Sequence, residues 1–115
     1  MAVEVIVTDE FVEWYRGLDD PGSDDVDVAV GVLESWGVGL GAPRSSEIKG
    51  ASFALRELRL QSNARPFRIF YAFDPRRQAV LLIGGDKTGV GNKRFYAQMI
   101  PLAERIWQEY LDENP

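Results

Sequence analysis

The chain has 115 residues, of which 45% are hydrophobic and 11% aromatic, and it contains neither cysteine nor histidine. We expect one folded domain over residues 1–115, and the composition excludes disulfides, thiolate nucleophiles, zinc–thiolate sites and histidine bases. Residues 1–48 carry a charge of -9, residues 49–94 of +7 and residues 95–115 of -3. Such a basic middle can attract a polyanion, although pairing with the acidic first part would explain it equally well.

The first third of the chain has the pattern of a strand followed by a helical hairpin. Residues 3–7 are mainly β-branched, as in a strand. Apolar residues then recur with helical spacing over 11–18 and 24–36, and the polar residues 19–23 predict a break between two helices. The glycine-spaced residues 37–42 follow a helix, whereas a dinucleotide-binding loop follows a strand, so we interpret them as a helix C-cap and linker.

The rest of the chain has the pattern of three strands and a helix. Short apolar-rich segments at 53–60, 67–74 and 78–85 are separated by polar turns and predict an antiparallel meander. The second turn begins with Asp74 and Pro75, which is typical of a type I turn. Residues 92–113 carry a helical apolar stripe that would pack on the sheet or on a partner. The order β-α-α-β-β-β-α predicts a small α+β domain.

The glycine-rich run 84–89 at the end of the last predicted strand does not have the spacing of a nucleotide-binding P-loop. Asp86 and Leu81 occupy the two positions at which a P-loop built around Lys87 would need glycine. Glycines within a strand allow close approach of another backbone or a ligand. We therefore interpret Gly84 and Gly85 as making room for an RNA backbone.

Charged residues lie among apolar neighbours on the predicted sheet. An ion pair of Glu57 with Arg59 or Arg68 at the edge of the core is one explanation. The other is an RNA-cleaving site, because attack by the 2'-hydroxyl needs a base, cations for the phosphate and an acid for the leaving oxygen. In that site Glu57 would be the base, Arg59, Arg68 and Lys87 the cations, and Tyr96 the acid or a stacking platform.

Further basic residues of the middle segment are candidate RNA contacts. They are Lys49, Arg56, Arg65, Lys93 and Arg94. Since the proposed chemistry uses only side chains that the chain possesses, we expect neither a metal ion nor another cofactor. No N-terminal signal segment and no apolar run long enough to span a bilayer is present in the sequence, so we expect a cytoplasmic protein with no membrane partner.

Three strings of the sequence resemble a known family. They are L-R-E-L-R at Leu55–Arg59, F-R-I-F-Y at Phe67–Tyr71 and L-L-I-G-G-D-K-T at Leu81–Thr88. With the order of elements, they are similar to toxins of bacterial type II toxin–antitoxin systems, the RelE/ParE superfamily, within its HigB-like, phage Gp49-like branch. The resemblance covers nearly the whole chain.

This resemblance implies a fold, an activity and partners. The fold would be a curved antiparallel sheet with helices covering one side. The activity would be metal-independent, ribosome-dependent endoribonuclease cleavage of mRNA, an mRNA interferase that arrests growth and is neutralised by a helix-turn-helix, HigA-like antitoxin. In such toxins Arg68 would be a phosphate-contacting cation, Lys87 the basic residue after the last strand, and Tyr96 the aromatic of the terminal helix, with Phe95 as a competitor.

The chain departs from this family in charge and in histidine content. RNA-cleaving members are usually basic, and some HigB relatives use histidine in the site. Either Glu57 and Tyr96 therefore transfer the protons, or the fold binds its antitoxin without efficient cleavage. The alternatives are a ParE-like toxin that inhibits DNA gyrase by binding and a non-catalytic antitoxin-binding domain whose basic middle docks an acidic segment.

Overall fold

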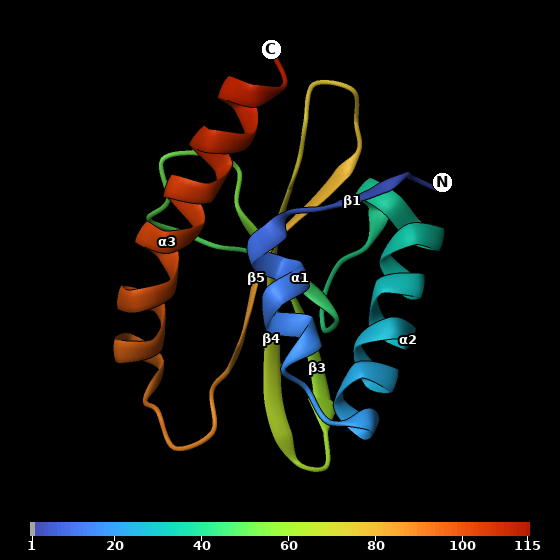
Figure 1. Ribbon diagram of the computed structural model, residues 1–115, viewed down its shortest axis with the longest axis vertical. Coiled ribbons are helices and arrows are strands. Elements are labelled where there is room, and N and C mark those ends of the chain that lie inside the picture. The colour runs from blue at the N-terminus through green and yellow to red at the C-terminus, as the bar shows by residue number, and fades with distance from the viewer. Residues whose placement is uncertain (1) are drawn as a thin grey trace.

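A computed structural model describes residues 2–115 and shows three α-helices around a five-stranded mixed sheet (Figure 1). In chain order the elements are β1 (Val5–Val7), α1 (Asp9–Arg16), α2 (Asp20–Trp36), the 3-10 turn η1 (Gly37–Gly39), β2 (Ser45–Glu47), β3 (Arg56–Ser62), β4 (Arg65–Phe73), β5 (Ala79–Asp86) and α3 (Asn92–Glu113). This arrangement confirms the α+β class. Within the described residues, no helix is both long and apolar enough to cross a membrane.

The strand order is β1-β5-β4-β3-β2. The predicted meander forms β3, β4 and β5, which pair antiparallel. Two details were not predicted: β1 pairs parallel with β5, and the three-residue β2 pairs with β3 at the far edge. A 2.8 Å hydrogen bond from the N–H of Arg77 to the carbonyl oxygen of Asp74 confirms a β-turn at the predicted place.

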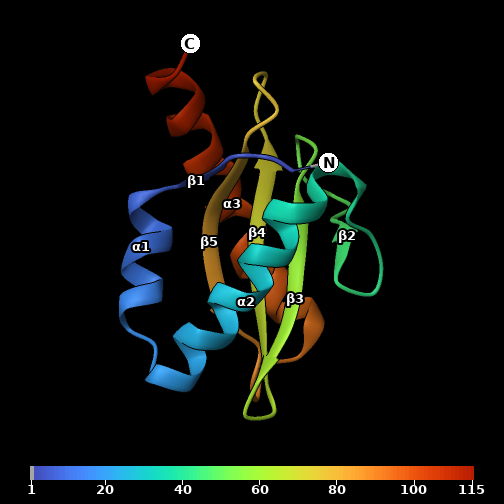
Figure 2. The same cartoon turned by 90° about the vertical axis from the view of Figure 1, so that its right-hand side faces the viewer.

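The helices cover both faces of the sheet. α1 and α2 pack on one face, where their apolar side chains meet alternate residues of β3, β4 and β5 (Figure 2). α3 packs on the opposite face, around Leu55, Phe70, Val80 and Leu82. The family resemblance had implied helices on one side only, whereas the apolar residues of these strands fill both faces and leave both to be covered.

The start of α2 differs from the prediction. Residues 19–23 were expected to break the chain, but α2 begins at Asp20. The Asp19 side chain caps it by accepting a 2.9 Å hydrogen bond from the N–H of Gly22, and Pro21 sits in the first turn, where its missing N–H costs nothing. The helix ends at Gly37 with φ +61°, as the sequence indicated.

The two glycines of β5 make room for helices and not for RNA, so that interpretation was wrong. A Cβ at Gly84 would lie 2.2 Å from the ring of Trp14 on α1. A Cβ at Gly85, on the other face, would lie 3.0 Å from the ring of Phe95 on α3. Each glycine therefore lets an aromatic side chain of a covering helix lie directly on the sheet.

The β4–β5 turn is attached to the end of α3 by a buried carboxylate. One oxygen of Asp74 accepts the backbone N–H groups of Arg76 (3.0 Å) and Gln78 (2.9 Å). The other accepts the Tyr110 hydroxyl at 2.8 Å. Burial and the contact with Asp74 raise the pKa of Tyr110 to about 12, which keeps this phenol a donor at neutral pH.

Candidate active site

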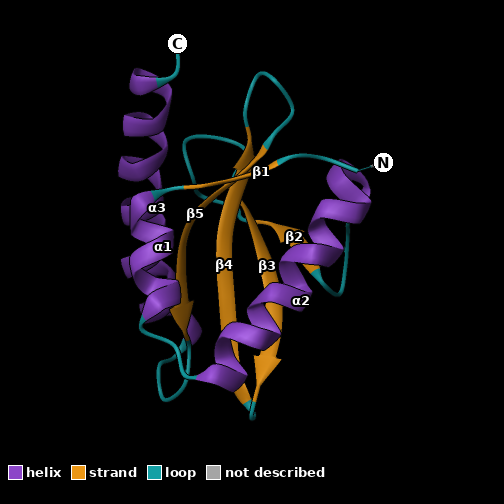
Figure 3. Cartoon of the chain, turned by 45° about the vertical axis from the view of Figure 1, so that its right-hand side comes forward, coloured by secondary structure: helices purple, strands orange, loops and turns teal. Residues whose placement is uncertain are grey.

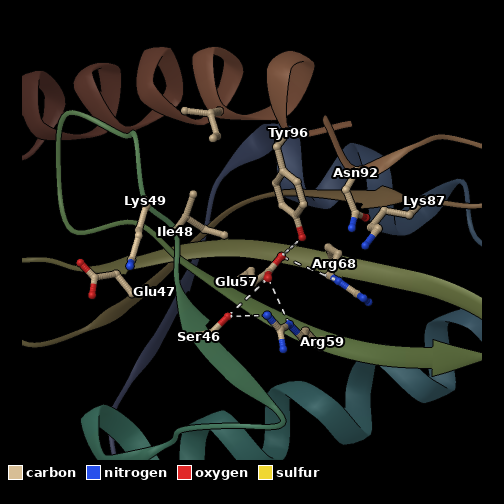
Figure 4. A pocket seen from close by; sticks show the side chains of 11 residues that line it. Ser46, Glu47, Ile48, Lys49, Glu57, Arg59, Arg68, Lys87, Asn92 and Tyr96 are labelled. Atoms are coloured by element: carbon tan, nitrogen blue, oxygen red, sulfur yellow. Dashed lines mark hydrogen bonds and ion pairs between the residues drawn. The ribbon is translucent and has the colours of Figure 1, made fainter. Parts of the chain in front are cut away.

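An open groove of ≈ 540 Å³ lies on the α3 face of the sheet, between the short edge strand β2 and the first turns of α3 (Figure 4). We call it the active-site groove. Polar and charged side chains from β2, β3, β4, the segment after β5 and α3 converge on it. Its lining residues are Ser46, Glu47, Ile48, Lys49, Glu57, Arg59, Arg68, Lys87, Asn92, Tyr96 and Ile100.

Glu57 lies at the centre of this groove and is only 2% exposed. One carboxylate oxygen, Oε1, accepts the Tyr96 hydroxyl at 2.5 Å and lies 3.8 Å from Nε of Arg68. The other, Oε2, accepts Nε of Arg59 at 3.1 Å and the hydroxyl of Ser46 at 3.4 Å (Figure 4). The buried carboxylate is therefore surrounded by hydrogen-bond donors, two of them cationic.

The strand register explains why these side chains meet. Glu57 and Arg59 are two residues apart on β3 and so point to the same face. Arg59 is paired directly with Arg68 of β4, which places two cations side by side. Like charges opposite one another destabilise a sheet, and Glu57 offsets that repulsion by contacting both. Ser46 of β2 is the register partner of Glu57 at the edge of the sheet.

The side chains of Arg59 and Arg68 differ in how exposed they are. The side chain of Arg59 is 41% exposed, and its Nη2 donates to the Ser46 hydroxyl at 2.8 Å. The side chain of Arg68 is only 12% exposed and donates from Nη1 to the carbonyl oxygen of Phe67 at 2.9 Å. Its Nε is the one buried side-chain polar atom among the described residues that lacks a hydrogen-bond partner. Arg68 is thus a fixed cation with an unused donor, and Arg59 is a cation that can move.

Lys87 and Tyr96 complete the groove at the end of β5. The backbone N–H of Lys87 donates to the carbonyl oxygen of Pro66 at 3.0 Å, which fixes the segment after β5 beside β4. The ammonium of Lys87 lies 5.6 Å from the centre of the Tyr96 ring. Burial, followed by the charge of Arg68, lowers the pKa of Lys87. Burial, followed by the hydrogen bond to Glu57, raises the pKa of Tyr96 and keeps its phenol protonated.

Of the two aromatics considered at the start of α3, only Tyr96 lines the groove. Phe95 is 4% exposed and packs on Phe70 in the core, with ring centres 6.0 Å apart. The five predicted catalytic residues therefore lie together: Glu57, Arg59, Arg68, Lys87 and Tyr96.

The residues predicted to contact RNA do not all lie in the active-site groove. Lys49 lines the groove, whereas Lys93 and Arg94 are exposed at the start of α3 outside its lining. Ser46 and Asn92 line it and were not singled out from the sequence. Ser46 belongs to a three-residue polar strand without a periodic apolar pattern, and Asn92 is the first residue of a helix, so neither position gives a sequence signal.

Arg56 and Arg65 lie on the opposite face of the sheet. Nε of Arg56 donates to the hydroxyl of Tyr71 at 3.4 Å, and its Nη2 donates to the carbonyl oxygen of Leu40 at 3.4 Å. Arg65 forms a 2.9 Å ion pair with Asp19 beside α2. These two arginines therefore hold the loops and helices on that face, and they do not contribute to the active-site groove.

Comparison with known proteins identifies the family of this chain. The model of the family described as phage-derived protein Gp49-like matches residues 13–108. The chain belongs to the Gp49-like family. It is 36% identical over 108 residues to a candidate toxin, HigB3, of Mycobacterium tuberculosis (strain ATCC 25618 / H37Rv), covering 93% of this chain and 92% of that protein. This Gp49-like chain thus resembles HigB3 over nearly the full length of both proteins.

Two further similarities agree with this assignment. The Gp49-like chain is 37% identical over 100 residues to a second candidate toxin of the same organism, HigB2, covering 85% of this chain and 49% of HigB2, about half its length. The structure of a doubly substituted variant of Escherichia coli toxin RelE in the free state covers 100% of both chains with a TM-score of 0.57 and 12% identity, which shows the fold alone. The chain is a HigB-like toxin, a component of a toxin–antitoxin system, and it has a fold like that of RelE.

Proposed function

We propose that this toxin is an endoribonuclease that cleaves mRNA on translating ribosomes in the cytoplasm and is neutralised by a helix-turn-helix antitoxin. The observation that carries the proposal is the Glu57 carboxylate, which contacts the phenol of Tyr96 and the guanidinium groups of Arg59 and Arg68 in one open groove. A proton acceptor, a proton donor and cations are what 2'-hydroxyl attack on a phosphodiester requires. All are side chains, so the reaction needs no metal ion or cofactor.

The proposed reaction is an in-line transesterification. Glu57 takes the proton of the 2'-hydroxyl, and the oxygen attacks phosphorus while Arg59, Arg68 and Lys87 stabilise the growing negative charge. The bond from phosphorus to the 5'-oxygen breaks, and the phenol of Tyr96 gives that oxygen its proton. The products are a 2',3'-cyclic phosphate and a 5'-hydroxyl. The proton held by Glu57 can then return to Tyr96 through their 2.5 Å hydrogen bond.

Phosphate binding would also free the base. Before RNA binds, Nε of Arg59 donates a 3.1 Å hydrogen bond to Oε2 of Glu57. A phosphate offers a guanidinium two parallel acceptors, and the 41% exposed Arg59 side chain can turn toward it. Arg68, which is more buried, would stay in place beside Glu57 as a fixed positive charge. The carboxylate is then exposed to the 2'-hydroxyl only when a phosphate is present.

Controlled expression in bacteria tests this proposal. Glu57→Gln keeps the side-chain shape and removes the charge, and Glu13→Gln, at an exposed position on α1, is the matched control. We expect the parent protein and the control to arrest growth and to produce new transcript ends at translated codons, and Glu57→Gln to do neither while remaining folded. Cleavage that persists in Glu57→Gln would contradict the proposal. Growth arrest with intact transcripts and inhibited supercoiling would instead indicate a gyrase-directed toxin.

A further inference from the structure

A second groove lies on the face of the sheet opposite the active site. The helices α1 and α2 diverge from their short connection (Figure 3) and leave between them a groove of ≈ 500 Å³, which we call the hairpin groove. Its floor is apolar and consists of Phe11, Val26 and Leu81. Val7 at one end is 48% exposed. An open apolar groove of this kind is typical of an interaction site.

The wall formed by α2 is open at Gly31. A Cβ at this position would have no atom within 4 Å, so a side chain from outside can approach the helix backbone there. Val30 lines the groove beside it. The hydroxyl of Tyr15 on α1 donates to Asp27 on α2 at 2.7 Å and holds the two walls together. The groove is thus a preformed feature whose walls are connected by a hydrogen bond.

The charge around the hairpin groove selects its partner. Residues 9–36 contain nine acidic side chains and one basic side chain. The charged residues that line the groove itself are Arg16, Asp27 and Glu34, so its lining is net acidic and the surrounding hairpin is strongly so. This surface repels RNA and anionic lipid, and it attracts a partner that carries lysine or arginine beside its apolar residues.

We infer that the hairpin groove is the docking site for an amphipathic α-helix of a partner protein, with an aliphatic ridge that enters the groove and basic residues on both flanks. The walls of the groove are two helices whose backbone groups are already hydrogen-bonded, and the edge strand β1, which reaches the groove at Val7, has only three residues, so an extended peptide would find little backbone to pair with. A helix satisfies its own backbone and needs only side-chain contacts. This inference does not depend on ribonuclease activity.

A second copy of the chain fits this groove less well than a basic helix. Two hairpin grooves facing each other would bring two acidic rims together. The basic side chains that line a groove of this chain, such as Arg59 and Lys87, lie on the opposite face of the sheet. Pairing that groove with the hairpin groove of another copy would be head-to-tail and would extend into open chains.

Binding of a designed peptide to the whole protein tests the inference. The probe is a helical peptide of about 15 residues with leucine at i, i+3, i+4 and i+7 and lysine on the flanks, and its matched partner carries glutamate in place of lysine. We expect fluorescence anisotropy to show binding of the lysine peptide alone, which weakens as salt is raised. Absence of binding, or equal binding of both peptides, would overturn the inference.

Variants of α2 locate the binding site. Gly31→Phe fills the groove and should weaken binding at least about tenfold, whereas Val28→Phe, at a 69% exposed position outside it, should leave binding unchanged. Glu34→Lys should weaken binding more than Asp24→Lys, which changes the net charge equally. Sedimentation that reveals a dimer abolished by Gly31→Phe would assign the groove to a second copy and overturn the inference. Binding of the lysine peptide to Gly31→Phe as tightly as to the parent protein would also overturn the inference.

Discussion

Removing the hydroxyl of Tyr96 separates its role in cleavage from its role in stability. In Tyr96→Phe the 2.5 Å hydrogen bond to Oε1 of Glu57 is lost, while the ring that contacts Lys87 remains. A hydrogen bond to a charged group contributes about 1.5–3 kcal/mol. We expect the lower end, about 1.5 kcal/mol, because Glu57 keeps its contacts with Arg59 and Arg68.

The melting temperature converts this energy into a measurable shift. Unfolding entropy is about 2.1 cal/mol/K per residue, so 1.5 kcal/mol lowers the melting temperature of this 115-residue chain by about 6 °C. Cleavage of mRNA on purified translating ribosomes should fall by at least about 100-fold, because the 5'-oxygen loses its proton donor. Single-turnover cleavage and circular dichroism on the same preparations measure both effects.

Tyr110→Phe is the matched control, because the Tyr110 hydroxyl also donates to a buried carboxylate, that of Asp74, at 2.8 Å. Its loss should lower stability by a similar amount and leave cleavage unchanged, since it lies at the far end of α3. If Tyr96→Phe lowered the melting temperature but cleaved RNA at the parent rate, the phenol would be structural and the assignment of Tyr96 as the acid would be wrong.

Three other outcomes follow from the structure. Gly84→Ala should lower the free energy of unfolding in urea by about 3 kcal/mol or more, because its Cβ would overlap the Trp14 ring. Gly41→Ala is the control and should be nearly neutral, because a Cβ there has no atom within 4 Å. Equal stabilities of the two variants would contradict the packing of Trp14 on Gly84. Arg68→Lys should stay folded and lose about 100-fold in cleavage, since an ammonium cannot present a planar fork, and full activity would refute this role. Because the pKa of Tyr110 is raised to about 12, its hydrogen bond stabilises the fold fully below pH 10, and this stabilisation is lost as the pH rises toward 12. The free energy of unfolding of the parent protein should fall by about 1 kcal/mol over this range after solvent screening, and that of Tyr110→Phe should not.

Local patterns in the sequence predicted the elements whose residues follow a clear period. The strands β3, β4 and β5 and the helix α3 were expected close to their observed positions because alternation and helical spacing are strong there. The start of α2 was missed because proline and glycine indicate a break by composition, yet both are accepted in a first helical turn. The parallel pairing of β1 with β5 joins residues more than half the chain apart, so no local pattern reports it.

The candidate site was predictable to the extent that it lies on strands. Glu57, Arg59 and Arg68 are charged residues among apolar neighbours, and period-two alternation places them on one face. Ser46 could not be predicted, because its position depends on the pairing of a short edge strand with β3. The role of Gly84 was misread for a related reason: the Trp14 ring that needs the space belongs to a helix far away in the sequence.

The chemical identity of the cut ends is the most direct test of the central claim that the Glu57 groove cleaves RNA. Purified protein and its Glu57→Gln variant would be added to ribosomes translating a defined mRNA, and the fragments analysed for their termini. The account predicts a 2',3'-cyclic phosphate and a 5'-hydroxyl with the parent protein, and a rate at least about 100-fold lower with Glu57→Gln. Intact mRNA with the parent protein, or equal cleavage by both proteins, would contradict it.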